Sequence, residues 1–102
     1  MIDLTGLWKS VSVDEGVEKC GEMTLRQTGN EVKGADYVEE IEYRLNGRIE
    51  RDSFIGSWED DNGYFGDFTL EIKENGNKLE GHYTIRPENV RLSYHATRTS
   101  KG

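Results

Sequence analysis

The stretch from Phe54 to Ile72 reads Phe-Ile-Gly-Ser-Trp-Glu-Asp-Asp-Asn-Gly-Tyr-Phe-Gly-Asp-Phe-Thr-Leu-Glu-Ile, and it carries the clearest structural signal in the chain. Apolar and polar residues alternate on both sides of Asp61-Asn62-Gly63. The side chains of this cluster and its tolerance of positive φ favour a chain reversal. The stretch is therefore predicted to form a β-hairpin in which Asp60 faces Tyr64 across the turn.

This register pairs large rings with glycines. It places Trp58 opposite Gly66, and it places Phe68 opposite Gly56. A ring that lies over a strand glycine fills the space which the missing side chain leaves, and such cross-strand pairs stabilise a sheet. The register of the hairpin is thus predicted residue by residue.

The rest of the chain repeats the same pattern. Period-two alternation, interrupted by Gly, Asn and Asp clusters, recurs about every 10 to 12 residues, and no 3.6-residue period is sustained. Without a linker or a break in composition, residues 1–102 are predicted to form a single all-β domain. The predicted strands are Gly6 to Val13, Gly21 to Gln27, Glu31 to Val38, Ile41 to Arg51, Phe54 to Glu59, Tyr64 to Lys73, Lys78 to Ile85 and Val90 to Arg98.

Short connections favour antiparallel pairing of neighbouring strands, that is, an up-and-down meander. Gly29-Asn30 and the cluster 74–77 have good turn chemistry, whereas Glu39-Glu40 has poor turn chemistry. The acidic segment 14–19 is predicted to be a flexible loop. Asn46-Gly47 resembles a turn, but a reversal there would move Ile49 to the opposite face, so a continuous strand with a bend at the glycine is preferred.

Composition restricts the class of protein. The chain of 102 residues carries a formal net charge of −7, which opposes attraction to nucleic acid or to anionic membranes. Its single cysteine, Cys20, excludes an internal disulfide. There is no apolar run of roughly 20 residues and no signal-peptide pattern at residues 1–6. We expect a cytoplasmic protein.

One face of each predicted strand is apolar and the other is mainly charged. The apolar face consists of Trp8, Met23, Leu25, Val32, Val38, Ile41, Leu45, Ile49, Phe54, Phe68, Leu70, Ile72, Leu79, Ile85, Val90, Leu92 and Ala96. A meander of eight such strands buries this face when it closes into a barrel, which also removes the unpaired edges. The first strand is then predicted to pair with the last.

The predicted eight-stranded meander has Gly6-Leu7-Trp8 at the start of its first strand and Arg98 on the inward face of its last strand. In these features the chain resembles the calycin superfamily of lipocalins, fatty-acid-binding proteins and avidins. The resemblance implies a calycin-like barrel in which the Arg98 side chain packs across Trp8 and closes one end. A guanidinium can stack on an indole face and contribute about 1 kcal/mol. The chain lacks the lipocalin Thr-Asp-Tyr motif. It also has Ser10 and Asp14 where avidins carry asparagine and serine, so biotin binding is not implied.

Several inward positions are polar, although burying a polar group without a partner costs roughly 1 to 3 kcal/mol. A small, hydrated cavity at the barrel mouth would accommodate them, and it suggests non-catalytic binding of a small hydrophobic or anionic molecule. In this interpretation Arg51 holds an anionic group, and aromatic side chains form flat walls. The predicted ligand-binding residues are Trp58, Arg51, Tyr43, Tyr83, Tyr94, Asp36, Gln27 and Ser10. The opposing interpretation is that Arg51 and Asp36 simply reach water at the barrel rims.

Other functions have less support. No catalytic residues, cofactor or metal site are predicted. His82 and His95 are expected to lie side by side on the outer face, but a third ligand is not evident. An alternative function is an acidic interaction module, of an inhibitor, immunity or anti-defence type, which contacts a basic protein through its outer face or rim. Homo-oligomerisation is open as well.

Overall fold

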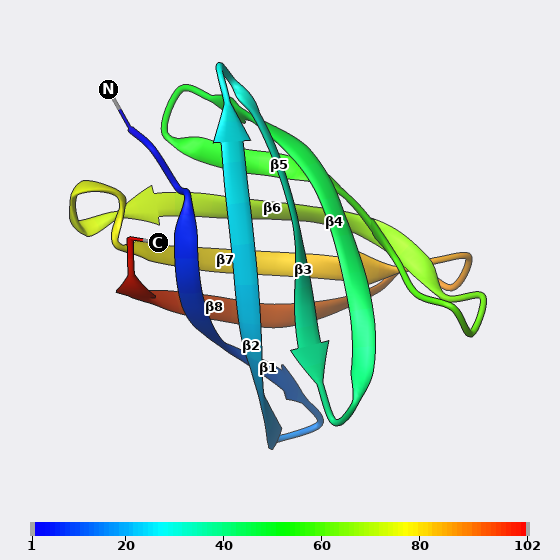
Figure 1. The fold of residues 1–102 in the computed structure, drawn as a ribbon. Coiled ribbons are helices and arrows are strands. Elements are labelled where there is room, and N and C mark those ends of the chain that lie inside the picture. Colours follow the sequence, from blue (N-terminus) through cyan, green and yellow to red (C-terminus); the bar gives the residue numbers. More distant parts are fainter. Residues whose placement is uncertain (1, 102) are drawn as a thin grey trace.

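A computed structural model describes residues 2–101, and it contains eight strands and one short 3-10 turn. The elements are β1 (Gly6–Asp14), β2 (Val17–Thr28), β3 (Glu31–Val38), β4 (Ile41–Glu50), β5 (Ser53–Glu59), β6 (Phe65–Lys73), η1 (Glu74–Gly76), β7 (Lys78–Ile85) and β8 (Val90–Ser100). Each strand pairs antiparallel with the next, and β1 also pairs with β8, so the sheet closes into a barrel. Figure 1 shows β1 to β4 crossing in front of β5 to β8. The predicted fold class is confirmed.

The β5–β6 hairpin has the predicted register. Trp58 pairs with Gly66 and Gly56 pairs with Phe68. A Cβ atom at Gly66 would lie 1.8 Å from the carbonyl oxygen of Thr84 and 2.8 Å from Nε1 of Trp58. Only glycine therefore allows the strand and the indole ring to approach so closely.

The β1–β2 and β4–β5 connections have different bounds from those predicted. The segment 14–19 is not a loop, because Glu15 and Gly16 alone form the turn, with φ of 50° and 79°, and β2 begins at Val17. The first residues of β2 lack alternation because they are exposed on both sides, which concealed the strand in the sequence. Strand β4 runs continuously through Gly47, as predicted, but it ends at Glu50.

The Glu39-Glu40 connection is a two-residue turn despite its poor turn chemistry. Val38 pairs with Ile41 across it, and the two glutamates have φ of 50° and 68°. Residues other than Gly and Asn in this left-handed region cost roughly 1–2 kcal/mol each. The hydrophobic pattern of β3 and β4 thus imposes the turn on unfavourable residues.

The substitution Glu40→Gly is expected to raise the free energy of unfolding by about 0.5–1 kcal/mol, because relief of strain exceeds the added chain entropy. Urea denaturation measures the difference. The control is Glu22→Gly, at an exposed position inside β2, where the same change should lower the free energy of unfolding. A loss of stability in both variants would contradict the strain.

The barrel interior is divided into a packed end and an open end. The buried core cluster contains Leu4, Trp8, Met23, Leu25, Val32, Phe54, Trp58, Phe68, Leu70, Leu79 and Ala96. Most of the predicted apolar face lies inside, but Val90 is 44% exposed because it begins β8 at the open end. Leu4 was not predicted, and it is fully buried because the segment before β1 folds across the packed end.

Trp8 and Arg98 close the packed end. The Arg98 guanidinium carbon lies 5.1 Å from the centroid of the indole ring. The same guanidinium donates to the carbonyl of Thr5 at 2.9 Å, to the carbonyl of Gly76, and to Oδ1 of Asn77 at 3.2 Å. Nε1 of Trp8 donates to the carbonyl of Leu4 at 2.9 Å. The predicted plug therefore also ties the first residues and the β6–β7 connection to the barrel.

Replacing Arg98 with alanine should lower the free energy of unfolding by about 3 kcal/mol, since a cation–π contact and several charge-assisted hydrogen bonds disappear together. Urea denaturation provides the measurement. Arg26→Ala, which removes an exposed arginine on β2, is the matched control and should change stability by less than about 0.5 kcal/mol. Equal effects of the two substitutions would show that the plug contributes no special stability.

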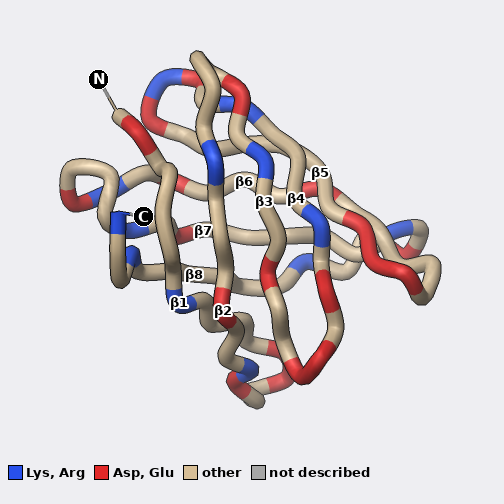
Figure 2. Tube along the Cα trace, in the orientation of Figure 1, with Lys and Arg blue, Asp and Glu red and all other residues tan. Residues whose placement is uncertain are grey.

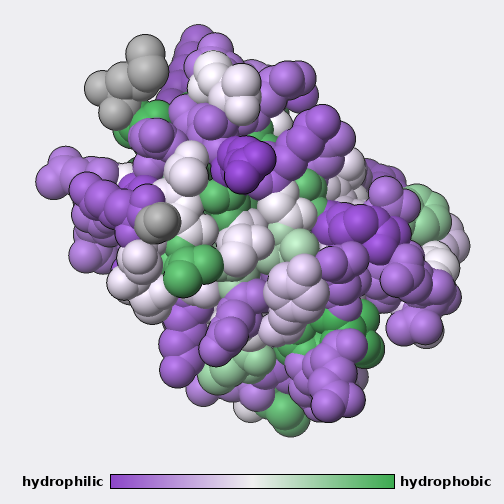
Figure 3. Space-filling view, viewed as in Figure 1, coloured by the Kyte–Doolittle hydropathy of each residue, from purple (hydrophilic) through white to green (hydrophobic). Residues whose placement is uncertain are grey.

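The outer surface is predominantly polar. Figure 3 shows hydrophilic side chains over most of one face, with apolar atoms in scattered patches. The exposed large apolar residues are Leu7, Val17, Tyr37, Tyr64, Phe65 and Val90. Across residues 2–101, no helix is long and apolar enough to cross a membrane.

Candidate functional site

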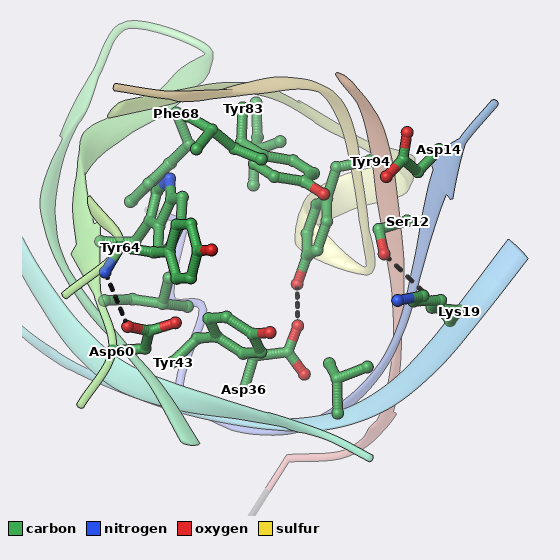
Figure 4. Close-up of a pocket in the computed structure, with 15 residues that line it drawn as sticks. Ser12, Asp14, Lys19, Asp36, Tyr43, Asp60, Tyr64, Phe68, Tyr83 and Tyr94 are labelled. Carbon is green, nitrogen blue, oxygen red and sulfur yellow. Dashed lines mark hydrogen bonds between the residues drawn. The ribbon is translucent and has the colours of Figure 1, made fainter. Parts of the chain in front are cut away.

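A cavity of about 420 Å³ lies inside the barrel at the end opposite the Trp8–Arg98 plug. All eight strands contribute to its wall, together with the β5–β6 connection, and Figure 4 shows their side chains converging on it. The lining residues are Ser12, Asp14, Lys19, Asp36, Val38, Tyr43, Leu45, Trp58, Asp60, Tyr64, Phe68, Leu70, Tyr83, Ile85 and Tyr94. Cavities of this size, with apolar walls and a few polar groups, are typical of small-molecule sites.

Four aromatic rings form a continuous wall. The centroids of Tyr43 and Trp58 are 5.7 Å apart, those of Trp58 and Tyr83 6.0 Å, and those of Tyr83 and Tyr94 6.0 Å, all edge to face. The Trp58 indole is fixed because its Nε1 donates to the carbonyl of Thr84 at 3.0 Å. The four rings together line the cavity with aromatic surface.

A buried carboxylate lies beside this wall. Asp36 is only 4% exposed, and its Oδ1 accepts a hydrogen bond from Ser10 at 2.8 Å while its Oδ2 accepts one from Tyr94 at 2.7 Å. Burial raises the pKa of Asp36, and the hydrogen bonds from Tyr94 and Ser10 partly offset this effect. Burial, and then the adjacent charge of Asp36, raises the pKa of Tyr94 well above its ordinary value, so its hydroxyl remains a donor. Three predicted site residues thus form one connected group.

The raised pKa of Asp36 predicts a pH dependence of stability. Because the native pKa lies above the unfolded value, the native state binds more protons between the two, and stability from this group falls as pH rises through that window. Wild-type protein should therefore lose stability relative to Asp36→Asn as the pH rises above about 4, the ordinary pKa of an aspartate. Urea denaturation at several pH values measures the trend.

Asp52→Asn, an exposed aspartate in the turn between β4 and β5, is the control for this experiment. It removes the same charge at the packed end, so it reports pH effects that are general to carboxylates. A wild-type trend that matches Asp36→Asn throughout the range would show that Asp36 titrates as an ordinary exposed carboxyl.

The mouth of the cavity carries further charges. Asp60 is 7% exposed, and its Oδ1 accepts hydrogen bonds from the backbone N–H groups of Asn62 and Tyr64, both at 2.9 Å. Lys19 lies opposite, and its Nζ is 3.5 Å from Oε1 of Glu39. Asp14 is exposed and lines the cavity, and it forms no ion pair within residues 2–101.

Two predicted site residues lie at the other end of the barrel. Arg51 occupies the exposed turn after β4, with φ of 57°, and does not line the cavity. Gln27 holds the first residues in place, because its Oε1 accepts from the backbone N–H of Leu4 and its Nε2 donates to the carbonyl of Ile2, both at 2.9 Å. The alternation of apolar and polar residues predicts that Arg51 and Gln27 lie on the inner face. It does not predict at which end of the barrel they lie.

Several lining residues were missing from the predicted site. Ser12 was not among the predicted ligand-binding residues, and Asp14 and Lys19 were assigned to a loop. Asp60 and Tyr64 flank the turn of the β5–β6 hairpin. If residues 14–19 are taken as the ends of two strands, the period-two pattern continues through them. It then predicts that Asp14 and Lys19 face inward.

The two histidines do not lie opposite each other. The register pairs His82 with Ser93 and His95 with Glu80, so they occupy diagonal positions, and the predicted side-by-side placement is wrong. Nδ1 of His82 is 3.4 Å from Nη2 of Arg91. Within the described chain, no three His, Cys, Asp or Glu side chains are grouped to hold a metal ion.

Comparison with known proteins identifies the fold but no relative by sequence. No protein-family model matches the chain, and no curated protein matches it. Among solved structures, it is similar to a de novo designed fluorescence-activating β-barrel, with a TM-score of 0.73 and 14% sequence identity. The alignment covers 97% of this chain and 100% of the designed one. At this identity the similarity establishes an eight-stranded barrel.

Proposed function

We propose that this protein is a calycin-like barrel that binds a small molecule in its open end without transforming it. The proposal depends chiefly on one observation, the cavity of about 420 Å³ lined by Tyr43, Trp58, Tyr83 and Tyr94. The stacking of Arg98 on Trp8 at the opposite end supports the calycin-like assignment. The similarity to a designed fluorescence-activating barrel agrees with a barrel of this size accommodating a small guest.

The lining of the cavity combines apolar surface with a few polar groups, and this combination suits a partly apolar ligand. Leu45, Phe68, Leu70 and Ile85 contribute hydrocarbon surface, and the aromatic wall adds flat surface beside it. Polar groups are few and lie at defined points. Such a site gains affinity from apolar burial and orientation from the polar groups.

The expectation of an anionic ligand loses its main support. It depended on Arg51 as the cationic anchor, and Arg51 lies in a turn at the packed end. The ligand-binding role is therefore assigned to Tyr43, Trp58, Tyr83 and Tyr94 with Asp36, and Ser10 acts behind them by donating to Asp36.

A neutral probe, 1-naphthalenemethanol, tests the site. We expect binding with a Kd on the order of 0.1–1 mM, measured by NMR titration of ¹⁵N-labelled protein. The chemical-shift changes should be largest for residues at the strand ends around the cavity. The substitution Ser12→Trp should weaken binding at least about tenfold, because the indole occupies the cavity and removes about 1.4 kcal/mol or more of binding free energy.

Ser93→Trp is the matched control, since Ser93 is an exposed position on β8 whose backbone pairs with Val13, next to Ser12. It introduces the same side chain on the outer face and should leave the Kd unchanged. Undiminished binding by Ser12→Trp, or an absence of binding by wild-type protein, would overturn the proposed site.

The alternative of a basic protein partner stays a prediction. Figure 2 shows acidic residues gathered at the β3–β4 turn and near the β5–β6 connection. These groups include Glu39, Glu40, Glu59 and Asp61. Association that weakens steeply with added salt would support this second function.

A further inference from the structure

We propose that the cavity selects an organic cation, an ammonium group on an apolar or aromatic body, over neutral and anionic molecules of the same shape. This inference rests on the proposed binding function and specifies the chemical class of the ligand. Three features of the cavity support it: its balance of charges, its aromatic lining and the position of its most buried carboxylate.

The charges that line the cavity are predominantly negative. Asp14, Asp36 and Asp60 belong to the lining, whereas Lys19 is its only cationic residue among those described. The Lys19 ammonium is already 3.5 Å from the carboxylate of Glu39. An anion entering this cavity would face carboxylates without a free cationic partner, and a cation would meet complementary charge.

The aromatic wall also suits a cation. The face of an indole or phenol ring attracts an ammonium group within about 6 Å of its centroid. Within residues 2–101 the cation–π contact is that of Arg98 with Trp8, at the packed end. Among residues 2–101, no protein cation therefore lies over Tyr43, Trp58 or Tyr83, and all three side chains line the cavity.

Asp36 is placed to receive the charged end of such a ligand. It lies on β3 directly across from Tyr43, and Figure 4 shows its carboxyl group between Tyr43 and Tyr94 at the cavity wall. Ser10 and Tyr94 each supply one hydrogen bond. A carboxylate has about four acceptor sites, so acceptor capacity remains for an ammonium group. Burial strengthens this attraction because solvent screens it less.

The acidic mouth favours the same class of ligand. Glu39 and Glu40 form the turn at the end of β3, where Lys19 offsets one of the two charges. Glu59 and Asp61 lie at the β5–β6 connection at the same end of the barrel, where Arg44 offsets one of the two. Their summed field raises the local concentration of cations near an opening and accelerates their capture at low ionic strength. The charges in the cavity and the charges at its mouth thus both favour a positively charged ligand.

A matched set of probes tests the proposal: 1-naphthylmethylamine in its ammonium form, 1-naphthalenemethanol and 1-naphthaleneacetate. NMR titrations at neutral pH and low salt give a Kd for each. The ammonium probe should bind at least about tenfold more tightly than the alcohol, and the carboxylate should bind most weakly. Equal or tighter binding of the alcohol or the carboxylate overturns the inference while leaving the proposed binding function intact. Failure of all three probes overturns both.

Substitutions identify the source of the selectivity. Asp36→Asn should reduce the preference for the ammonium probe over the alcohol at least about fivefold. Asp52→Asn, which removes the same charge at the packed end, should preserve the preference. If Asp36→Asn does not fold, Asp14→Asn provides the test, because Asp14 is exposed and lines the cavity; its preference should fall about twofold. An unchanged preference in the cavity variant contradicts the proposal.

Discussion

Closure of the sheet is the constraint on which the other features depend. β1 pairs with both β2 and β8, so every strand has two neighbours and the apolar face can only point into the barrel. The contact of Arg98 with Trp8 then occupies one end completely. Fully buried side chains such as Trp8 and Leu4 fill the interior at that end, whereas the rings around the other end leave a space between them. The cavity is thus a consequence of how volume is distributed along the barrel.

The polar interior has a clear energetic logic. A buried carboxyl such as Asp36 would be strongly destabilising without partners, and two hydroxyl donors supply them. Within residues 2–101, every buried side-chain nitrogen or oxygen atom has a hydrogen-bond partner. The raised pKa of Asp36 shows that its charged form is still disfavoured. A cationic guest would offset this cost, and stability and binding would then depend on the same carboxyl.

The sequence contains more information on the fold than on the site. Alternation, the Asp61-Asn62-Gly63 turn and the pairs of rings with glycines predict the strands and the β5–β6 register, because these features act locally. The strand ends around Glu15 and Gly16 were missed since exposed residues on both sides erase the period of two. Which residues share the cavity depends on barrel stagger, which no local pattern encodes. Arg51 was therefore assigned to the wrong end, whereas Trp58 and Tyr43 were grouped correctly.

The hydrogen bonds between Gln27 and the backbone of Ile2 and Leu4 have a practical consequence. The first described residues are tied across the packed end through Ile2 and Leu4, and Ser100 at the end of β8 pairs with Leu7 near the same end. Figure 1 shows the start of β1 and the end of β8 on the side away from the β1–β2 and β3–β4 turns. An affinity tag, a fused reporter or a sensor surface attached at either terminus would consequently leave the opening facing solution.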